Sequence, residues 1–361
     1  MFNYMEFFIA FLIALIVSYV ATFLVEKFAV RVQAVDHPNQ RKIHKKVTPR
    51  LGGLAIFFGM IAGILYLQPN HVYLYPILLG ALVIVLTGAL DDRYTIRPTL
   101  KLSGQLIAAA LVVFSGITIE RVTLPFLGII EFNPFFGAFI TILWIVGITN
   151  AINLIDGLDG LATGVTTIAL ISIFIMSLID TQMLVAMFSI VLIGANLGFL
   201  PHNFYPAKIY MGDTGSNFLG YMISVISIVG LFKEVAFFSF IIPVIVLAIP
   251  IFDTLTAIVR RLYNKESIMM ADNKHIHYQL IQGGYSHRKT VLIIYAFSAL
   301  FGFLAILFSY STTLVSLLIT IVVIFGLHVF AELAGIVMGG KRPVVSFLRR
   351  ILRKFQRKRS D

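Results

Sequence analysis

The chain has 361 residues, of which 59% are hydrophobic and only 12% are charged, and its mean hydropathy is +0.94. A soluble globular domain carries about 25% charged residues, and apolar runs long enough to span a bilayer as helix recur here from end to end. The composition therefore excludes an ordinary soluble protein. The absence of cysteine excludes disulfides, cysteine-ligated zinc and a thiol nucleophile.

The first apolar run, 7–25, has no basic segment before it and no small-residue cleavage site after it. We therefore expect a retained membrane helix rather than a removed signal peptide. Hydropathy predicts an all-α, polytopic membrane bundle of about eleven transmembrane helices. The expected spans are 5–27, 51–68, 74–90, 102–118, 137–155, 158–178, 183–200, 216–232, 236–255, 291–309 and 313–335.

The distribution of Lys and Arg predicts how these spans cross the membrane. With the N-terminus outside and the C-terminus cytoplasmic, 25 of the 28 basic residues fall in cytoplasmic segments, which is a positive-inside pattern. We expect one integral membrane catalytic domain, 1–335, and a basic cytoplasmic tail, 336–361. The tail is predicted to lie against anionic membrane lipid rather than to bind nucleic acid.

Polar residues gather at the cytoplasmic ends of the spans, where ionisable groups indicate function by default. The expected active-site loops are 31–50, 91–101, 150–160, 201–215 and 256–290. The first contains DHPNQRKIHKKVTPRLGG, which fits either a positive-inside loop or one that attracts phosphate. Its Gly52 and Gly53 would permit close approach of a backbone or a headgroup.

In GALDDRYTIRPTLK, Asp91 and Asp92 end the third span. Adjacent carboxylates repel each other unless a cation is near, and Mg²⁺, Arg93, Arg97 or Lys101 would each provide one. The C-terminus of a helix is also the unfavourable end for an acid. This placement favours a functional role over a structural one.

In NAINLIDGLDGLA (150–162), an amide or a carboxylate stands at every third position. Residues three apart are neighbours on a helix, so Asn150, Asn153 and Asp156 would form one polar ridge. The two glycines allow a reversal, after which Asp159 is expected to cap the next helix. These oxygens suit a hard cation such as Mg²⁺ or direct contact with a substrate.

In PHNFYPAKIYMGDTGSNFLG (201–220), Asp213 lies between two glycines before the eighth span. The N–H groups at such a helix start suit an anion, and a simple span-start cap is the alternative. Tyr210 would stack on a flat base, or belong to the interfacial aromatic belt.

The longest loop contains RRLYNKESIMMADNKHIHYQL, in which His275 and His277 flank an isoleucine. We expect these imidazoles to bind a phosphate or a sugar, because convincing further zinc ligands are lacking. Asp253, just before this loop, is expected to pair with Arg260 or Arg261.

Taken in order, PRLGG, DDRYTIRPTLK, NAINLIDGLDGLA, MGDTGSNFLG and DNKHIHYQL resemble the polyprenyl-phosphate N-acetylhexosamine-1-phosphate transferases, of the glycosyltransferase 4 type. PNQRKIHKKVTPRLGG resembles the undecaprenyl-phosphate N-acetylglucosamine-1-phosphate transferase branch. The alternative is the phospho-N-acetylmuramoyl-pentapeptide transferases, which read PTMGG and carry consecutive histidines in the last loop. Many relatives have a further histidine where this chain has Tyr278.

The resemblance implies transfer of N-acetylglucosamine-1-phosphate from UDP-GlcNAc to undecaprenyl phosphate, with release of UMP, at the cytoplasmic face of a bacterial cell membrane. It implies Mg²⁺ as the cofactor, with Mn²⁺ as a substitute, because such a transfer depends on positioning and charge neutralisation. The product would be used in the synthesis of a cell-envelope polymer, for which wall teichoic acid is the favoured candidate. Relatives tend to form homodimers, although the sequence itself marks no interface.

The resemblance also implies roles for individual residues, while leaving open whether a carboxylate acts as a base. An ion-coupled transporter is the alternative from another class, and acidic residues at span ends rather than mid-span disfavour it. The implied roles are catalysis for Asp91, Asp92, Asp156 and Lys101, metal binding for Asp213 and Asn153, nucleotide binding for Asp159, Asn203 and Tyr210, and sugar or phosphate binding for His275, His277 and Arg50.

Overall fold

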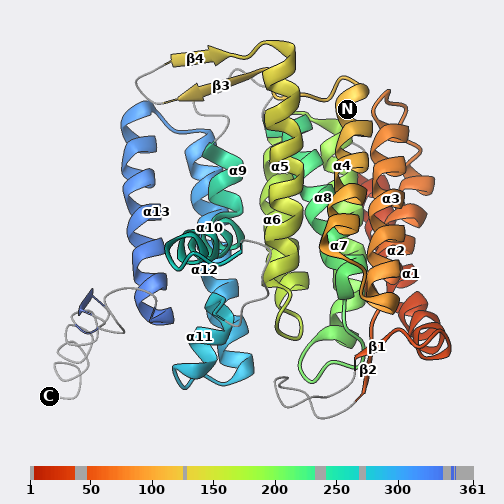
Figure 1. Ribbon diagram of the computed structural model, residues 1–361. Coiled ribbons are helices and arrows are strands. Elements are labelled where there is room, and N and C mark those ends of the chain that lie inside the picture. The colour runs from red at the N-terminus through yellow and green to blue at the C-terminus, as the bar shows by residue number, and fades with distance from the viewer. Residues whose placement is uncertain are drawn as a thin grey trace, which may run out of the picture.

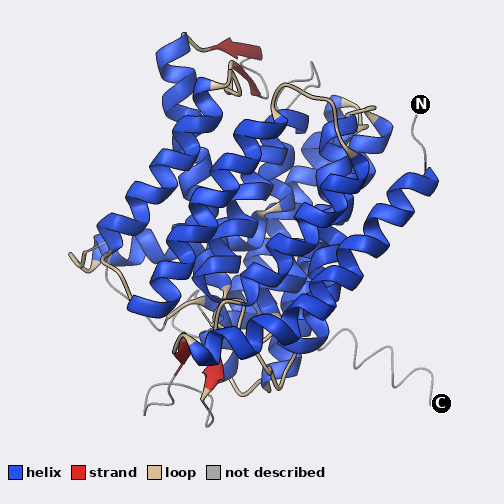
Figure 2. Cartoon of the chain, turned by 90° about the vertical axis from the view of Figure 1, so that its right-hand side faces the viewer, coloured by secondary structure: helices blue, strands red, loops and turns tan. Residues whose placement is uncertain are grey.

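The computed structural model describes residues 4–36, 47–124, 128–231, 241–267, 274–335, 343–344 and 346. This part of the chain is a bundle of helices with two short hairpins (Figures 1 and 2). Most of the basic tail predicted at 336–361, and loop residues 37–46, lie outside the described residues. The helices are α1 (Tyr4–Arg31), α2 (Gly52–Leu67), α3 (Leu74–Tyr94), α4 (Pro98–Phe114), α5 (Pro134–Ile155), α6 (Leu161–Ile179), α7 (Met183–Asn203), α8 (Gly212–Leu231), α9 (Ile241–Val246), α10 (Ala248–Tyr263), α11 (Ile276–Gln282), α12 (His287–Ser309) and α13 (Thr313–Ala334).

The predicted all-α class is confirmed for the described residues, and the chain is a multi-pass membrane protein by the number of its apolar helices. Every expected span coincides with at least one helix. Helices α2 and α4 are apolar but have only 16 and 17 residues. Those long and apolar enough to cross a membrane by themselves are α1, α3, α5, α6, α7, α12 and α13.

The ninth expected span, 236–255, is not one continuous helix in its described part. Helix α9 ends at Val246, and α10 begins at Ala248. Pro250 contributes to this break, because it has no N–H to donate to the carbonyl four residues earlier. Helix α10 is seen end-on in Figure 1, so it runs across the direction of the long helices.

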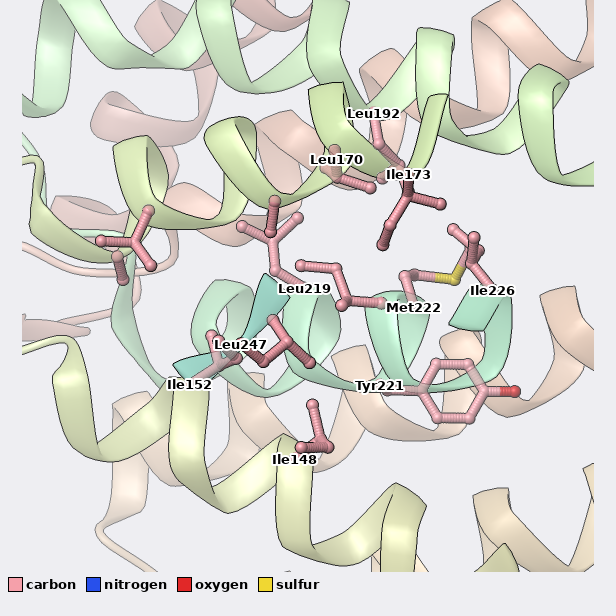
Figure 3. Packing of buried hydrophobic residues seen from close by; sticks show 14 of the residues in the cluster. Ile148, Ile152, Leu170, Ile173, Leu192, Leu219, Tyr221, Met222, Ile226 and Leu247 are labelled. Carbon is pink, nitrogen blue, oxygen red and sulfur yellow. The ribbon is translucent and has the colours of Figure 1, made fainter. Parts of the chain in front are cut away.

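Helix α8 forms the centre of the bundle and contacts α2, α3, α5, α6 and α7. Residues 214–230 are all buried. Figure 3 shows side chains of α8, among them Leu219 and Met222, packed between residues of α5 and α6. Close packing stabilises contacts between helices inside a bilayer, so the first turn of α8 extends from a firmly packed helix.

Glycines let other backbones approach this first turn. A Cβ placed on Gly53 would lie 2.1 Å from the backbone nitrogen of Gly215, and one on Gly88 would lie 2.6 Å from the Cα of Thr214. The close backbone approach expected at Gly53 is confirmed. The antiparallel hairpin of β1 (Val35–Asp36) and β2 (Thr48–Pro49) lies at the same end of the bundle as α11. The hairpin of β3 (Arg121–Leu124) and β4 (Gly128–Glu131) lies at the opposite end (Figure 1).

Candidate active site

A lysine joins two carboxylates where α3, α4 and α8 meet. Lys101 Nζ lies 2.6 Å from Asp91 Oδ2 and 2.8 Å from Asp213 Oδ2. The other oxygen of Asp91 accepts the backbone N–H of Ile96 at 2.9 Å, which fixes the carboxylate in the last turn of α3. Among the basic side chains considered for the aspartate pair, Lys101 lies at Asp91.

The neighbouring Asp92 has a different environment, because it caps α8 from another helix. Its Oδ1 accepts the N–H of Asp213 at 2.9 Å, and its Oδ2 accepts the N–H and the hydroxyl of Thr214 at 3.0 and 2.6 Å. The N–H groups at the start of α8 do bind an anion, but this anion belongs to the chain itself. Asp92 thereby anchors the segment that carries Asp213.

Buried amides link α4, α5 and α8 one helical turn away. Gln105 donates to Asn217 Oδ1 at 3.2 Å and accepts from Asn150 Nδ2 at 2.8 Å, and Asn217 donates to the carbonyl of Asp213 at 2.9 Å. A small cavity borders Lys101, Gln105 and Asn217. The sequence analysis missed Gln105, although its position four residues after Lys101 places both on one helix face.

The donor set around Asp213 fits a hard divalent cation. The carboxylates of Asp91 and Asp213 converge on one point, where the ammonium of Lys101 lies, and the amide of Asn153 lies beside Asp213. Mg²⁺ commonly takes one or two carboxylates and completes its shell with water and substrate phosphates. Such sharing is required here, because the described residues contain no complete set of three His, Cys, Asp or Glu ligands.

Asp156 follows directly after α5, and the negative charges of the other acidic groups of the site affect its pKa. Burial raises the pKa of Asp156 to about 8, with further contributions from Asp213 and Asp92, whereas Arg50 opposes the shift. Arg50 is itself held by a salt bridge of 2.8 Å to Asp36 in the β1–β2 hairpin. The structure therefore brings Asp156 and Arg50 near the carboxylates of Asp91, Asp92 and Asp213, which we call the carboxylate cluster.

The expectation that Asp159 caps the next helix is wrong. Gly160 occupies the N-cap position of α6 with φ 76° and without a side-chain cap, and Asp159 Oδ2 instead accepts the N–H of Ala207 at 2.9 Å. The reversal at Gly160 turns the Asp159 side chain away from the start of α6. Asp159 thus ties the α5–α6 loop to the loop that precedes α8.

Asn203 joins the same two loops. Its Oδ1 accepts the N–H of Gly160 at 3.1 Å and the hydroxyl of Thr163 at 2.8 Å, and its Nδ2 donates to the carbonyl of Ile209 at 3.1 Å. The next residue, Tyr210, exchanges backbone hydrogen bonds with the segment PRLGG. Burial raises the pKa of the half-buried Tyr210 to about 12, so its ring stays neutral.

His275 has a buried acidic partner that the sequence analysis did not identify. Its Nδ1 lies 3.0 Å from Asp253 Oδ2, and Asp253 Oδ1 accepts the N–H of Ile276 at 2.9 Å. Arg260 or Arg261 had been the expected partner. Proximity in sequence suggested the arginines, whereas the turn into α11 brings the histidine to Asp253.

His277 packs directly on the loop of the motif NAINLIDGLDGLA. A Cβ on Gly157 would lie 2.0 Å from His277 Nε2, and the rings of His277 and His275 are parallel, with centroids 6.0 Å apart. Neither ring nitrogen of His277 has a hydrogen-bond partner among the described residues. Burial lowers the pKa of His277 to about 4, so the neutral ring keeps one donor and one acceptor.

The twelve predicted site residues thus occupy three connected groups at one end of the bundle. The carboxylates of Asp91, Asp92 and Asp213 adjoin Asp156. Asp159 and Asn203 tie two loops together, and His277 reaches the site through Gly157. Side chains with this chemistry can hold a cation and phosphates together. The connection to the histidines was invisible in the sequence, because 120 residues separate Gly157 from His277.

The chain is similar in sequence to known proteins over most of its length. Residues 74–231 match the family model "Glycosyl transferase family 4". The chain is 43% identical to a Bacillus subtilis protein named "Probable undecaprenyl-phosphate N-acetylglucosaminyl 1-phosphate transferase", over 96% of this chain and 97% of that protein. It is 35% identical to the "Decaprenyl-phosphate N-acetylglucosaminephosphotransferase" of Mycobacterium leprae, over 81% of each chain. It is also 28% identical to the Escherichia coli "Undecaprenyl-phosphate alpha-N-acetylglucosaminyl 1-phosphate transferase", over 93% of this chain and 92% of that protein. The chain therefore belongs to glycosyl transferase family 4.

Proposed function

We propose that this protein transfers N-acetylglucosamine-1-phosphate from UDP-GlcNAc to undecaprenyl phosphate, giving undecaprenyl-diphospho-GlcNAc and UMP. The observation that carries the proposal is the convergence of Asp91 and Asp213 on Lys101 beside Asp156. These residues lie within the part of the chain that matches the family. The names of the similar proteins support GlcNAc as the transferred sugar and a polyprenyl phosphate as the acceptor.

In the proposed reaction, an oxygen of the lipid phosphate forms a bond to the phosphorus that carries the sugar. The bond from this phosphorus to the oxygen of UMP breaks, and UMP leaves. The second pKa of a phosphate monoester is about 6, so the acceptor is already largely dianionic near pH 7 and no carboxylate needs to act as a base. Lys101 would help to neutralise the phosphates, and Asp91 would orient its ammonium.

Asp213 and Asn153 are the proposed ligands of Mg²⁺. The ion, for which Mn²⁺ would substitute, would neutralise charge on the nucleotide diphosphate when bound. Asp92 would keep Asp213 in position by anchoring the first turn of α8. Asp156, whose pKa burial raises to about 8, would release its proton more readily once a cation approaches.

The nucleotide is proposed to lie over the joined loops that precede α6 and α8. Tyr210 would stack on the uracil, and Asp159 and Asn203 would shape the pocket by holding these two loops together. Arg50, His275 and His277 would contact the sugar and its phosphate. The unpaired ring nitrogens of His277 support this placement.

The proposed topology has eleven crossings, an N-terminus outside, and active-site loops with a basic tail in the cytoplasm. The bias of Lys and Arg supports this orientation. The product would enter synthesis of a cell-envelope polymer, wall teichoic acid being the proposed one. A homodimer is also proposed, by analogy with the family.

UMP release by the detergent-purified protein tests the reaction. Undecaprenyl phosphate, Mg²⁺ and either UDP-GlcNAc or UDP-MurNAc-pentapeptide would be supplied, and release with UDP-GlcNAc alone, abolished by EDTA, is expected. Release with the pentapeptide donor alone would assign the chain to the pentapeptide transferases instead. No release from well-folded protein with either donor would contradict the proposed reaction and reopen the transporter alternative.

A further inference from the structure

Asp253, an acidic residue outside the carboxylate cluster, forms a hydrogen bond with His275. Asp253 lies on α10, is 3% exposed, and directs one oxygen to His275 Nδ1 and the other to the N–H of Ile276. Burying a carboxylate is costly unless hydrogen bonds and opposite charge compensate it. Both oxygens of Asp253 therefore accept compensating hydrogen bonds, and both partners lie at the start of α11.

The break between α9 and α10 makes this contact achievable. Because α10 runs across the bundle (Figure 1), a residue near its middle reaches the first turn of α11. His275 occupies the N-cap position of α11 with φ −66° and ψ 154°, and its own side chain does not cap the helix. Asp253 takes over that function from another helix and also holds the imidazole.

The two hydrogen bonds determine how His275 is presented. A ring nitrogen that faces a carboxylate at 3.0 Å carries the proton, since a carboxylate only accepts. Nδ1 is therefore the donor to Asp253, and Nε2 is the nitrogen that remains to meet a ligand. The parallel ring of His277 restricts rotation of the imidazole from one side.

We propose that Asp253 is a positioning residue for His275, which fixes the orientation of the ring and its Nδ1–H tautomer so that Nε2 meets the sugar-phosphate end of the nucleotide donor. This inference rests on the proposed function for the identity of the ligand. The competing explanation is that Asp253 only caps α11. The two explanations differ in whether the effect of Asp253 passes through the His275 side chain.

The Asp253→Asn substitution separates them. The asparagine keeps the volume and an oxygen for the N–H of Ile276, but its NH₂ group faces Nδ1 and favours the opposite tautomer. We expect UMP release to fall by about 10–100-fold, as for other groups that orient a functional histidine. Asp180→Asn is the matched control, because this aspartate accepts from the Tyr310 hydroxyl at 3.1 Å at the far end of α6, and it should leave the rate unchanged.

A double-mutant cycle with His275→Gln gives the decisive kinetic comparison. If Asp253 acts through His275, Asp253→Asn adds no further loss of UMP release in the His275→Gln protein. If the two losses multiply, Asp253 acts independently of the imidazole and the proposal is overturned. Retained thermal unfolding midpoints in detergent would show that the variants being compared are folded.

The tautomer of His275 can also be measured by NMR, independently of enzymatic activity. In protein labelled with ¹⁵N in the histidine rings, the His275 resonances are identified by their loss in His275→Gln. We expect a protonated Nδ1 in the wild type at pH 7 and a protonated Nε2 with bare Nδ1 in Asp253→Asn. A wild-type Nδ1 without a proton would overturn the inference, even if Asp253→Asn failed to fold. Absence of UMP release by the wild type would count against the reaction instead, and the spectrum would still decide the positioning.

Discussion

Asp91 and Asp92 are adjacent in sequence, yet their side chains meet different partners. Asp91 shares the Lys101 ammonium with Asp213, whereas both oxygens of Asp92 accept hydrogen bonds from α8. The first arrangement places one ammonium between two carboxylates, whose oxygens would also suit a divalent cation. The second arrangement is a fixed helix cap. At the scale of single residues, the two aspartates therefore differ in role because their side chains have different hydrogen-bond and charge partners.

Replacement of Asp213 by asparagine should abolish Mg²⁺-dependent turnover while leaving a folded, membrane-inserted protein. The amide keeps the shape of the side chain but loses the charge that balances Lys101 and would hold the metal. We expect UMP release to fall by at least about 100-fold. The unfolding midpoint in detergent should stay near that of the wild type, and near-native activity would contradict the assigned metal site.

Asp156 makes the stability of the ligand-free protein depend on pH. The pKa of this carboxyl is about 8 in the folded state, against 3.8 ordinarily. Between these values the folded state holds a proton that the unfolded state has lost, so the free energy of unfolding decreases as pH rises. Between pH 6 and pH 8, the unfolding midpoint of the wild type should fall more than that of Asp156→Asn. Equal falls would show that Asp156 is not the titrating group.

Among the structural elements, the five-residue loop between α5 and α6 connects most of the site. The Tyr295 hydroxyl donates to the carbonyl of Gly160, and Asn203 accepts the N–H of the same glycine. His277 packs on Gly157. Contacts from α7, α11 and α12 therefore meet on a segment that contributes little apolar surface of its own. Its conformation depends on these neighbours, which makes it sensitive to added volume.

The Gly157→Ala substitution should disturb this junction. The new methyl group would lie 2.0 Å from His277 Nε2, so α11 or the loop must shift, at a cost of about 1–3 kcal/mol in unfolding free energy. UMP release should fall by more than about 10-fold, because small displacements of positioning groups are costly in catalysis.

Gly147→Ala, in the preceding helix α5, is the control, since a Cβ there meets nothing within 4 Å. It should leave both the unfolding midpoint and the UMP release rate close to those of the wild type. Similar losses in the two variants would mean that the removal of a glycine in itself, and not the contact with His277, explains the effect.

At the scale of the whole molecule, a buried central helix carries a polar end. Helix α8 is buried along almost its entire length and carries Asp213 in its first turn, so the apolar core and the site share one element. The loops with predicted function gather at this end of the bundle. Such segregation lets one face of a membrane protein bind charged substrates while its other surfaces meet lipid.

The cysteine-free sequence allows a direct test of the proposed orientation. Asn70→Cys, between α2 and α3, should react with a membrane-impermeant maleimide in intact cells. Asn264→Cys, at the end of α10, should react only after permeabilisation, because the positive-inside pattern places it in the cytoplasm. Both positions are exposed, and the reverse labelling pattern would invert the topology.

Hydropathy and motif order determined the helical membrane class and the family, because these depend on local composition and on residue types at short spacing. They also predicted the set of site residues. Local rules failed at Asp159, where an expected helix cap became a contact between loops, and at 236–255, where an expected span is divided between α9 and α10. They also missed Gln105 and could not pair Asp253 with His275. Only the tertiary structure decided these partners, because hydrogen bonds between side chains far apart in sequence form only after packing has brought their helices together.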